Sequence, residues 1–502
     1  MCSRIFYPRS SKDFTNQLLE GQRYRHQFGD KRLYHRYRQL LSQMIANQQA
    51  AISRLSTSWK EQIAYYRFLR NSNVEIPELI YESCRLQVSV VSGSDLLVPI
   101  DGSSIGMRLH KKHSDEWQRK LGVIDDNRTP GFYVYPSLVV DRSTGILHGL
   151  GDISVYTRPL VVGTAAEKRA LRKARNPLTF DEKEGSIWSL VVSNTSKRLQ
   201  AARSVTYLMD QGADKYESLE RIISETGHDF IVRSKENREA ESVSSAGKTG
   251  RLSEILSSET WSETHIVRIR GLHHYSKSSG ALVQRKEREA KLRIRYSKVI
   301  LSRPAGYSSK LPVISKPLSV IEVVEDASTV PSGESPIHWR LLTTWSIDSV
   351  EKAWEVVSAY QFRWTIEQLF RVLKKEGFDV ESSQLEDPDS LIKQVIMSLK
   401  ASSEAMQLTL ARDGKTFIPI ETMFDDHQQQ ALKRLNARLS SETQKVKNSH
   451  AENSLAWAAW VIARLGNWSG YQSQRPPGPI TMKRGLDKFY DILWAWELKD
   501  DS

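Results

Sequence analysis

The chain has 502 residues, of which 72 are lysine or arginine and 59 are aspartate or glutamate, so its formal net charge at neutral pH is +13. Hydrophobic residues make up 39% of the chain, a composition that builds packed cores and excludes a largely disordered protein. The positive charge favours a polyanionic partner, either nucleic acid or an anionic membrane. The length indicates about two to four domains.

Several classes of protein do not fit the sequence. The N-terminus has no apolar run of the kind found in secretory signals, and the most apolar helix candidate, which begins at Leu455, is too short to cross a bilayer. The two cysteines, Cys2 and Cys84, are too few for a disulfide framework or a cysteine zinc site. We therefore expect a cytoplasmic protein.

The first segment, residues 1–75, is expected to be helical and rich in charge. Within it, residues 21–41 carry six lysines or arginines against one acid, with three tyrosines interleaved. Cations contact phosphates and aromatic rings stack on bases, so the segment predicts a DNA-binding domain. The alternative is a solvated amphipathic helix that buries Leu33, Leu40 and Leu41, but the excess of cations is larger than solubility requires.

The next part of the chain has the order of an α/β core. Its patterns predict a strand that ends at Asp101, a hairpin or meander, a helix, a strand that ends at Asp210 with a helix after it, and one more strand. In chain order these are residues 86–104, 131–159, 185–202, 204–227 and 229–235.

Residues 236–335 interrupt this order and read as an all-β insertion. The polar stretch 236–252 is expected to be a loop, and the strand around Arg293 and Arg295 alternates apolar with basic residues, which predicts one cationic face. A strand that begins near His338 then rejoins the core. From Ser349 onward the chain is expected to be mainly helical, with a tryptophan-rich helical end.

A single helix is expected from about Asp348 to beyond residue 374. At about 100° per residue, one 80° arc of this helix holds a carboxylate, three cations and a phenol. The residues in this arc are Tyr360, Arg363, Glu367, Arg371 and Lys374. One interpretation is a surface helix with i,i+4 ion pairs worth about 0.2–0.5 kcal/mol each. The other is a carboxylate metal ligand beside a phosphate clamp.

Two further carboxylates could complete such a metal site. Asp101 and Asp210 each end an expected strand, where open α/β sheets place their ligands, although each could instead cap a turn or a helix. Together with Glu367 they offer the hard oxygen ligands that Mg²⁺ prefers. Three carboxylates can hold two ions about 3.5–4 Å apart and promote an in-line phosphoryl displacement.

A family resemblance rests on this helix. Tyr360, Arg363, Glu367 and Lys374 spell Y-x2-R-x3-E-x6-K, which resembles the YREK signature of bacterial cut-and-paste DDE transposases of the Tn-five type. Further segments resemble the same family in the same order over nearly the whole chain. They include FGDKR, YRFLRNSNV, MDQGAD, FIVRSK, WRLLTT, EDPDSL and SLAWAAWVIARLG.

The resemblance implies an α/β fold with an RNase H-like catalytic core at residues 76–410. The core would carry a β-rich insertion at about 236–335. A DNA-end-binding domain (residues 1–75) and a helical dimerisation domain (residues 411–502) would flank it. The partners implied are double-stranded DNA, as element ends and target, and a second copy of the chain in a synaptic homodimer at the bacterial nucleoid.

The resemblance also assigns roles to individual residues. Asp101, Asp210 and Glu367 would be catalytic ligands of two Mg²⁺ ions, for which Mn²⁺ substitutes. The remaining positions would contact DNA. Tyr360, Arg363 and Lys374 would hold terminal phosphates, Trp339 would capture a flipped base, Arg233 and Lys235 would add contacts, and Arg32 and Arg36 would recognise the end. A core tryptophan remains the alternative role for Trp339.

The expected activity is DNA cleavage at the element ends through a hairpin intermediate, followed by strand transfer into target DNA. Two alternatives remain open. One is a catalytically silent DNA-binding regulator derived from a transposase. The other is a host nuclease of RNase H type, which would cut unrelated DNA as well as element ends.

Overall fold

The computed structural model describes residues 26–496 with internal gaps. The gaps are residues 48, 87–90, 108–114, 127, 159, 161–179, 244–246, 270–271, 276–281, 286, 306–311, 375–377, 415–416, 421–422, 425, 441–446, 472–475, 479–480, 483, 487, 490–491 and 494–495. The chain forms two compact units. The first unit is Met1–Arg203 with Trp364–Ser502, and the second is Ser204–Arg363. No described helix is long and apolar enough to cross a membrane.

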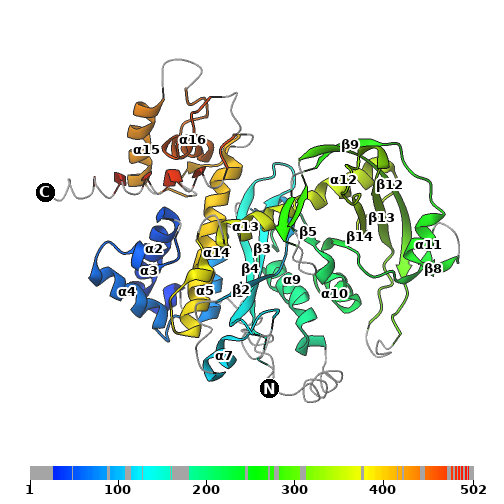
Figure 1. Ribbon diagram of the computed structural model, residues 1–502, viewed down its shortest axis with the longest axis horizontal. Coiled ribbons are helices and arrows are strands. Elements are labelled where there is room, and N and C mark those ends of the chain that lie inside the picture. The colour runs from blue at the N-terminus through cyan, green and yellow to red at the C-terminus, as the bar shows by residue number, and fades with distance from the viewer. Residues whose placement is uncertain are drawn as a thin grey trace. The chain divides into compact units, whose positions relative to one another are not determined.

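The first unit begins with short helices, as expected (Figure 1). They are η1 (His26–Gly29), α2 (Lys31–Asn47), α3 (Ile52–Leu55), α4 (Trp59–Arg70) and α5 (Ile76–Ser83). Ser58 caps α4 by accepting a hydrogen bond from the N–H of Glu61 at 3.2 Å. Leu40 and Leu41 are buried on α2. Residues 1–25 of the expected DNA-binding segment lie outside the described residues.

An antiparallel sheet follows in the same unit. It contains β1 (Asp95–Pro99), β2 (Ser103–Gly106), β3 (Gly131–Asp141) and β4 (Leu147–Tyr156). The expected hairpin is confirmed, because β3 pairs with β4 from Tyr133 to Val140 and also pairs with β1 and β2. Asp141 closes the turn by accepting from the N–H groups of Ser143 and Thr144. The helices α7 (Asp115–Leu121) and α9 (Ile187–Arg198) come before and after this hairpin.

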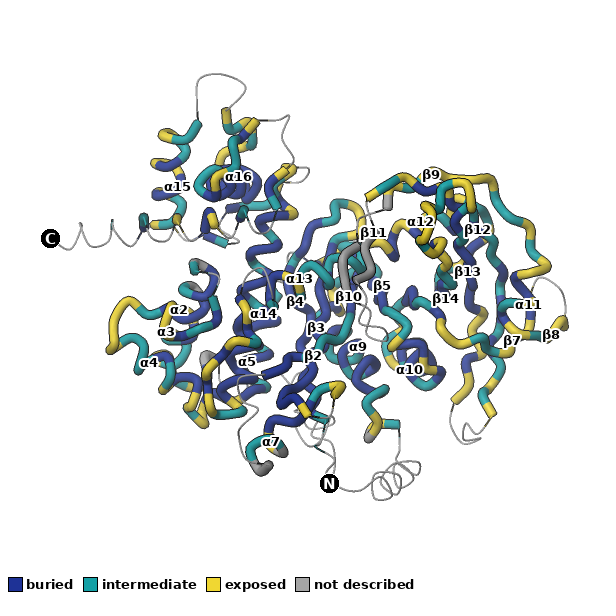
Figure 2. The backbone as a smooth tube through the Cα atoms, viewed as in Figure 1, coloured by how far each residue is buried: buried dark blue, intermediate teal, exposed yellow. Residues whose placement is uncertain are grey.

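The rest of the first unit is helical. It contains α13 (Trp364–Lys374), η8 (Val380–Ser382), α14 (Pro388–Ala411), α15 (Asp426–Leu439) and α16 (Leu455–Leu465). The long helix α14 is buried along most of its length and packs against α2, α4, α5, α13, α16 and β4 (Figure 2). Asp387 caps it by accepting from the N–H of Ser390 at 2.9 Å. A helix buried on nearly all sides is held by tertiary packing.

The second unit contains the expected strand–helix–strand element. β5 (Ser204–Met209) and β6 (Asp229–Arg233) pair in parallel, and α10 (Tyr216–Arg221) with the π-helical turn η6 (Ile222–Thr226) connects them. The connection ends at Gly227, whose φ of 68° favours glycine. β14 (His338–Thr343) pairs with β6, so the prediction that this strand rejoins the core is confirmed.

The insertion is rich in strands, but the prediction that it is all-β is wrong. Its strands are β7 (Glu239–Ser242), β8 (Thr249–Arg251), β9 (His265–Ile269), β10 (Leu272–Tyr275), β11 (Leu282–Arg285), β12 (Arg288–Leu301) and β13 (Leu318–Glu325). The helix α11 (Leu252–Ser257) interrupts them, because it buries Leu252, Ile255 and Leu256 together. The hairpin β7–β8 lies where a loop was expected, since Ala240 and Ser242 alternate inward.

The expected continuous helix from Asp348 is also wrong. The structure has α12 (Val350–Gln361) and then α13, with a tight turn at Phe362 and Arg363 between them. The N–H of Phe362 donates to the carbonyl of Ala359 at 3.1 Å, and the N–H of Arg363 donates to the carbonyl of Tyr360 at 3.0 Å. Both hydrogen bonds span three residues, as in a 3-10 helix, and they tighten the last turn of α12. The 80° arc assumed one continuous helix, but Tyr360 lies on α12, Arg363 lies in the turn, and Glu367 and Lys374 lie on α13.

Candidate functional site

Asp101 lies two residues after the end of β1, close to the expected end of the strand. Ile100 bridges to Ser137 on β3, which fixes the end of the strand. The Asp101 carboxylate is half-buried, and its Oδ1 accepts from the N–H of Gly102 at 2.8 Å. A side chain on Gly102 would overlap the ring of Tyr135, so the residue after the carboxylate has to be glycine.

Glu367 lies on α13, which packs against β1 and β3. Ile366, Leu369 and Leu373 are buried on this helix, whereas Glu367 is half-buried and Arg371 is exposed. The first unit thus places Glu367 on a helix in contact with the strand that precedes Asp101. Two of the three expected metal ligands belong to this one unit.

Lys374 ends α13 and is held by the neighbouring strand. Its Nζ donates to the carbonyl of Ser104 and forms an ion pair with Glu381 Oε1 at 3.4 Å. The same Glu381 oxygen accepts from the N–H of Gly106 at 3.2 Å. Lys374 is therefore tied to β2, the strand after Asp101. Glu381 could not be found from the sequence, because an acid in a short turn carries no local signal of such a pair.

Asp210 follows β5 in the second unit, as expected. Its Oδ1 accepts from the N–H of Gly212 at 2.7 Å and caps the short helix η5 (Gln211–Ala213), so the capping role weighed for it is confirmed. The carboxylate is half-buried.

Asp214 lies four residues further along this loop and was not singled out by the sequence analysis. Its side chain is fully buried and forms an ion pair with Arg238 at 2.8 Å. It also accepts from the N–H groups of Lys235 and Glu236, at 2.8 and 2.9 Å, and from the hydroxyl of Ser234 at 3.2 Å. A buried carboxylate that is paired and hydrogen-bonded in this way joins the loop after β5 to the loop after β6.

The two expected DNA contacts after β6 differ in their surroundings. Arg233 is half-buried and its Nη2 donates to the carbonyl of His338 at 3.4 Å. The side chain of Lys235 is exposed, while its backbone is fixed by Asp214. The loop that carries Lys235 is therefore held in place with the lysine at the surface.

Trp339, Tyr360 and Arg363 come together in the second unit. The rings of Trp339 and Tyr360 meet edge to face, with centroids 6.3 Å apart, and the Arg363 guanidinium carbon lies 5.8 Å from the Tyr360 centroid. Tyr360 is buried and Trp339 is half-buried. A cation over an aromatic ring contributes about 0.5–1 kcal/mol at exposed sites. The structure thus groups three of the expected DNA-binding residues.

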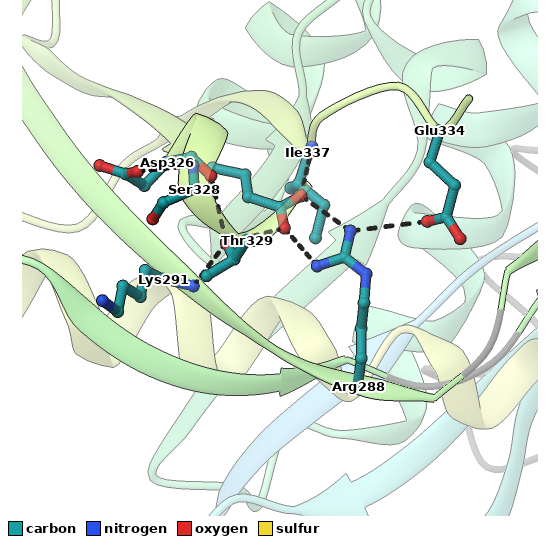
Figure 3. A network of polar contacts seen from close by, with 8 residues as sticks. Arg288, Lys291, Asp326, Ser328, Thr329, Glu334 and Ile337 are labelled. Carbon is teal, nitrogen blue, oxygen red and sulfur yellow. Dashed lines mark hydrogen bonds and ion pairs between the residues drawn. The ribbon is translucent and has the colours of Figure 1, made fainter. Parts of the chain in front are cut away.

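A polar network fixes the connection that leads into β14 and Trp339 (Figure 3). Glu325 pairs with Arg288 and accepts from the N–H of Ile337 at 3.0 Å and the hydroxyl of Thr329 at 3.2 Å. Burial alone would raise the pKa of Glu325, but these hydrogen bonds outweigh it and hold the pKa below its ordinary value. Glu322 pairs with His338, the residue before Trp339, at 2.8 Å.

The basic strand β12 is engaged within the protein. Arg293 and Arg295 lie with their guanidinium carbons 4.7 and 4.3 Å from the Trp261 ring centroid, and Arg295 forms an ion pair with Glu322 at 2.6 Å. Both arginines are half-buried. The expected alternation of apolar and basic residues is present. However, both arginines pack on the Trp261 ring and Arg295 pairs with Glu322, so this face is not an open cationic surface.

The two expected end-recognition residues lie on α2. The Arg32 side chain is 91% exposed, and its Nη2 bonds to Asp30 at 3.0 Å. This side-chain hydrogen bond holds the pKa of Asp30 below its ordinary value. Arg36 is half-buried with its guanidinium carbon 5.7 Å from the Tyr65 ring centroid. The helix therefore presents Arg32 to the surroundings and packs Arg36 against α4.

Among the described residues, no group of three or more His, Cys, Asp and Glu side chains is arranged to hold a metal ion. Asp101 and Glu367 belong to the first unit and Asp210 to the second.

Two family models match the chain. The model described as "Transposase DNA-binding" matches residues 19–74, which include Arg32 and Arg36. The model described as "Transposase DDE domain" matches residues 188–403, which include Asp210 and Glu367, while Asp101 lies before the match. A DDE domain cleaves and joins DNA with the help of divalent metal ions. Over these two ranges the chain is therefore similar to a transposase DNA-binding domain and to a transposase DDE domain.

Proposed function

We propose that the chain is a cut-and-paste transposase of the Tn-five type, which cleaves DNA at the ends of its element through a hairpin and transfers the freed strand to target DNA. The observation that carries the proposal is the placement of Glu367. It lies on a helix packed against β1, the strand that precedes Asp101, in a chain matched by a DDE model.

Asp101, Asp210 and Glu367 are the proposed ligands of two Mg²⁺ ions, with Mn²⁺ as a substitute. Each is a half-buried carboxylate at the end of a strand or on the helix beside one, and hard carboxylate oxygens suit Mg²⁺. When bound, the ions would supply Lewis-acid stabilisation of the attacking and leaving oxygens. The chain itself holds two of the carboxylates with glycine N–H groups, from Gly102 and Gly212, which orients them before DNA binds.

The proposed DNA contacts divide into four groups. Arg32 and Arg36 would recognise the element end, and Arg233 and Lys235 would contact its backbone. Tyr360, Arg363 and Lys374 would hold terminal phosphates, with the Lys374 charge shared between DNA and Glu381. Trp339 would stack on a flipped base, and the network around Glu325 and Glu322 supports this role by fixing the strand that carries the ring.

The proposed domains are residues 1–75 for DNA-end binding, 76–410 for catalysis and 411–502 for homodimerisation in a synaptic complex. Helix α16 is buried within the single chain, where it packs against α14 and α15. The tryptophans Trp457 and Trp460 thus belong to the core of the protomer, which supports the core role weighed for this helix. Other surfaces of this domain would form the dimer contact.

The test uses labelled duplexes that carry the inverted repeats flanking the gene, incubated with Mg²⁺ or Mn²⁺. Wild-type protein is expected to cut at the repeat, and Asp101→Ala and Glu367→Ala are expected to bind but not cut. Asp95→Asn is the matched control, because Asp95 begins the same strand and pairs with Arg203. Cleavage by either alanine variant would refute the assignment. Binding without metal-dependent cleavage by the wild type would support a silent regulator.

A further inference from the structure

Two adjacent polar residues of α14 are buried against the DNA-binding helices. Lys393 is 5% exposed and Gln394 is 1% exposed. The Nζ of Lys393 donates to the carbonyls of Leu69 and Asn71, both at 3.0 Å, and the Nε2 of Gln394 donates to the carbonyl of Ala50. Lysine is rarely buried so completely, and here it bonds to main-chain carbonyls.

The ammonium group of Lys393, on α14, lies at the C-terminal end of α4. The carbonyls of Leu69 and Asn71 belong to the last turn of this helix and to its cap, where the helix dipole is negative and carbonyls lack partners within the helix. An ammonium group suits this position. Burial lowers the pKa of Lys393, against the opposing effect of Asp389 and Asp387, and the two carbonyls compensate the buried charge.

Gln394 holds a second point of the DNA-binding region. Ala50 lies between α2 and α3, and its carbonyl accepts from Gln394 while its N–H donates to the carbonyl of Phe378 at 3.3 Å. Phe378 itself is fully buried. The α2–α3 connection is thus held by Phe378, which precedes α14, and by Gln394 on α14. Lys393 holds the end of α4.

The C-terminal part of α14 is hydrogen-bonded to the sheet that contains β1 and β4. The Nε2 of Gln407 donates to the carbonyls of Leu147 and His148, at 3.3 and 3.0 Å, on β4. Helix α13, which carries Glu367, also packs against α14. One helix therefore bonds to the backbone of the region matched as DNA-binding and to the backbone of the sheet that contains β1.

We propose that Lys393 and Gln394 are positioning residues that fix helices α2–α4 to α14, and through α14 to the sheet that contains β1, so that recognition of a DNA end aligns the cleavage site. The proposal rests on the proposed function, since it concerns cleavage at bound ends. It predicts that loss of these hydrogen bonds leaves DNA affinity intact but misaligns the scissile phosphate. A misplacement of about 1 Å far from the chemistry can cost about 100-fold in rate.

The test compares Lys393→Met, Lys393→Arg and Gln394→Met in the full chain. Lys400→Met is the matched control, because Lys400 lies on the same helix and pairs with Glu404 at 3.4 Å. The probe is the duplex that carries the flanking inverted repeat. The readouts are its dissociation constant, the cleavage rate at saturating DNA, the position of the cut, and the thermal unfolding midpoint.

Lys393→Met and Gln394→Met are expected to bind the duplex like the wild type but to cut it about 100-fold more slowly, or at shifted positions. Lys393→Arg should recover most of the rate, since it restores a buried cationic donor, and Lys400→Met should match the wild type. Equal losses of affinity and rate, or no loss of either, would overturn the proposal. A wild-type protein that does not cut would instead refute the proposed function.

Discussion

Asp210 and Asp214 occupy one loop and differ sharply in their surroundings. Asp214 is fully buried and is bonded to Arg238, Ser234 and two backbone N–H groups. Asp210 is half-buried and caps a short helix through the N–H of Gly212. Two carboxylates four residues apart thus serve different purposes. The buried one holds the loop, and the accessible one is placed where it can meet a ligand.

The same contrast recurs elsewhere in the protein. Glu325 and Glu322 are buried, whereas Asp101 and Glu367 are half-buried at a strand end and on the helix beside it. A carboxylate whose oxygens are occupied by the protein contributes to stability. One that keeps access to the surroundings can contribute to chemistry.

The largest expected effect is on cleavage by Asp210→Asn. Loss of a carboxylate ligand removes about 4 kcal/mol of charge stabilisation, so cleavage of the end duplex should fall about a thousandfold. The unfolding midpoint should stay close to that of the wild type, because the amide oxygen can still accept from Gly212. Single-turnover cleavage and calorimetry measure the two quantities, and cleavage within tenfold of the wild type would contradict the role of Asp210.

Asp214→Ala should instead lower the stability of the protein. It leaves the Arg238 charge buried without its partner, which costs about 3–5 kcal/mol of unfolding free energy. Urea unfolding followed by tryptophan fluorescence measures this loss. An Asp214→Ala protein that is as stable as the wild type would show that the buried network does not hold the loop.

The pH dependence of stability should report the buried carboxylates. The pKa of Glu325 lies below its ordinary value of 4.5, so its stabilising contribution is complete above about pH 4.5 and is lost as the pH falls through the lowered pKa. Glu325→Gln should therefore show a smaller fall in unfolding midpoint below pH 4.5 than the wild type. Parallel curves for the two proteins would exclude this effect.

The smallest effect separates an exposed arginine, Arg32, from a half-buried one, Arg295. Arg32→Gln should reduce the slope of log affinity against log salt by about 1, because an exposed arginine can release one counterion from a phosphate. Arg295→Gln should leave the slope unchanged, since Arg295 is occupied by Glu322 and Trp261. Duplex affinity measured over a range of salt concentrations tests both, and equal slopes for the two variants would remove the distinction.

Much of the fold around the expected site residues could be predicted because its signals are local. The strand–helix–strand element with Asp210, the β3–β4 hairpin and the strand before Asp101 all follow from short apolar runs and turn residues. The break after Gln361 could not be predicted, since the residues of α12 and α13 share helix-forming character and no proline or glycine marks the turn between them.

The long-range hydrogen bonds and ion pairs could not be predicted for a different reason. Asp214 meets Arg238 across 24 positions, and Lys393 meets Leu69 across 324. Nothing in the sequence near either residue marks its partner. The same is true of Trp261, which covers the basic stripe of β12 from a separate segment.

The most direct measurement is a change of metal preference in Asp210→Cys. A thiolate disfavours Mg²⁺ and accepts softer metal ions, so this variant should fail to cut the end duplex with Mg²⁺ and recover with Mn²⁺. Glu381→Cys is the control, because Glu381 is held by Lys374 and Gly106 and should show no change of preference. Full Mg²⁺ activity in Asp210→Cys would contradict the assignment of Asp210 as a metal ligand.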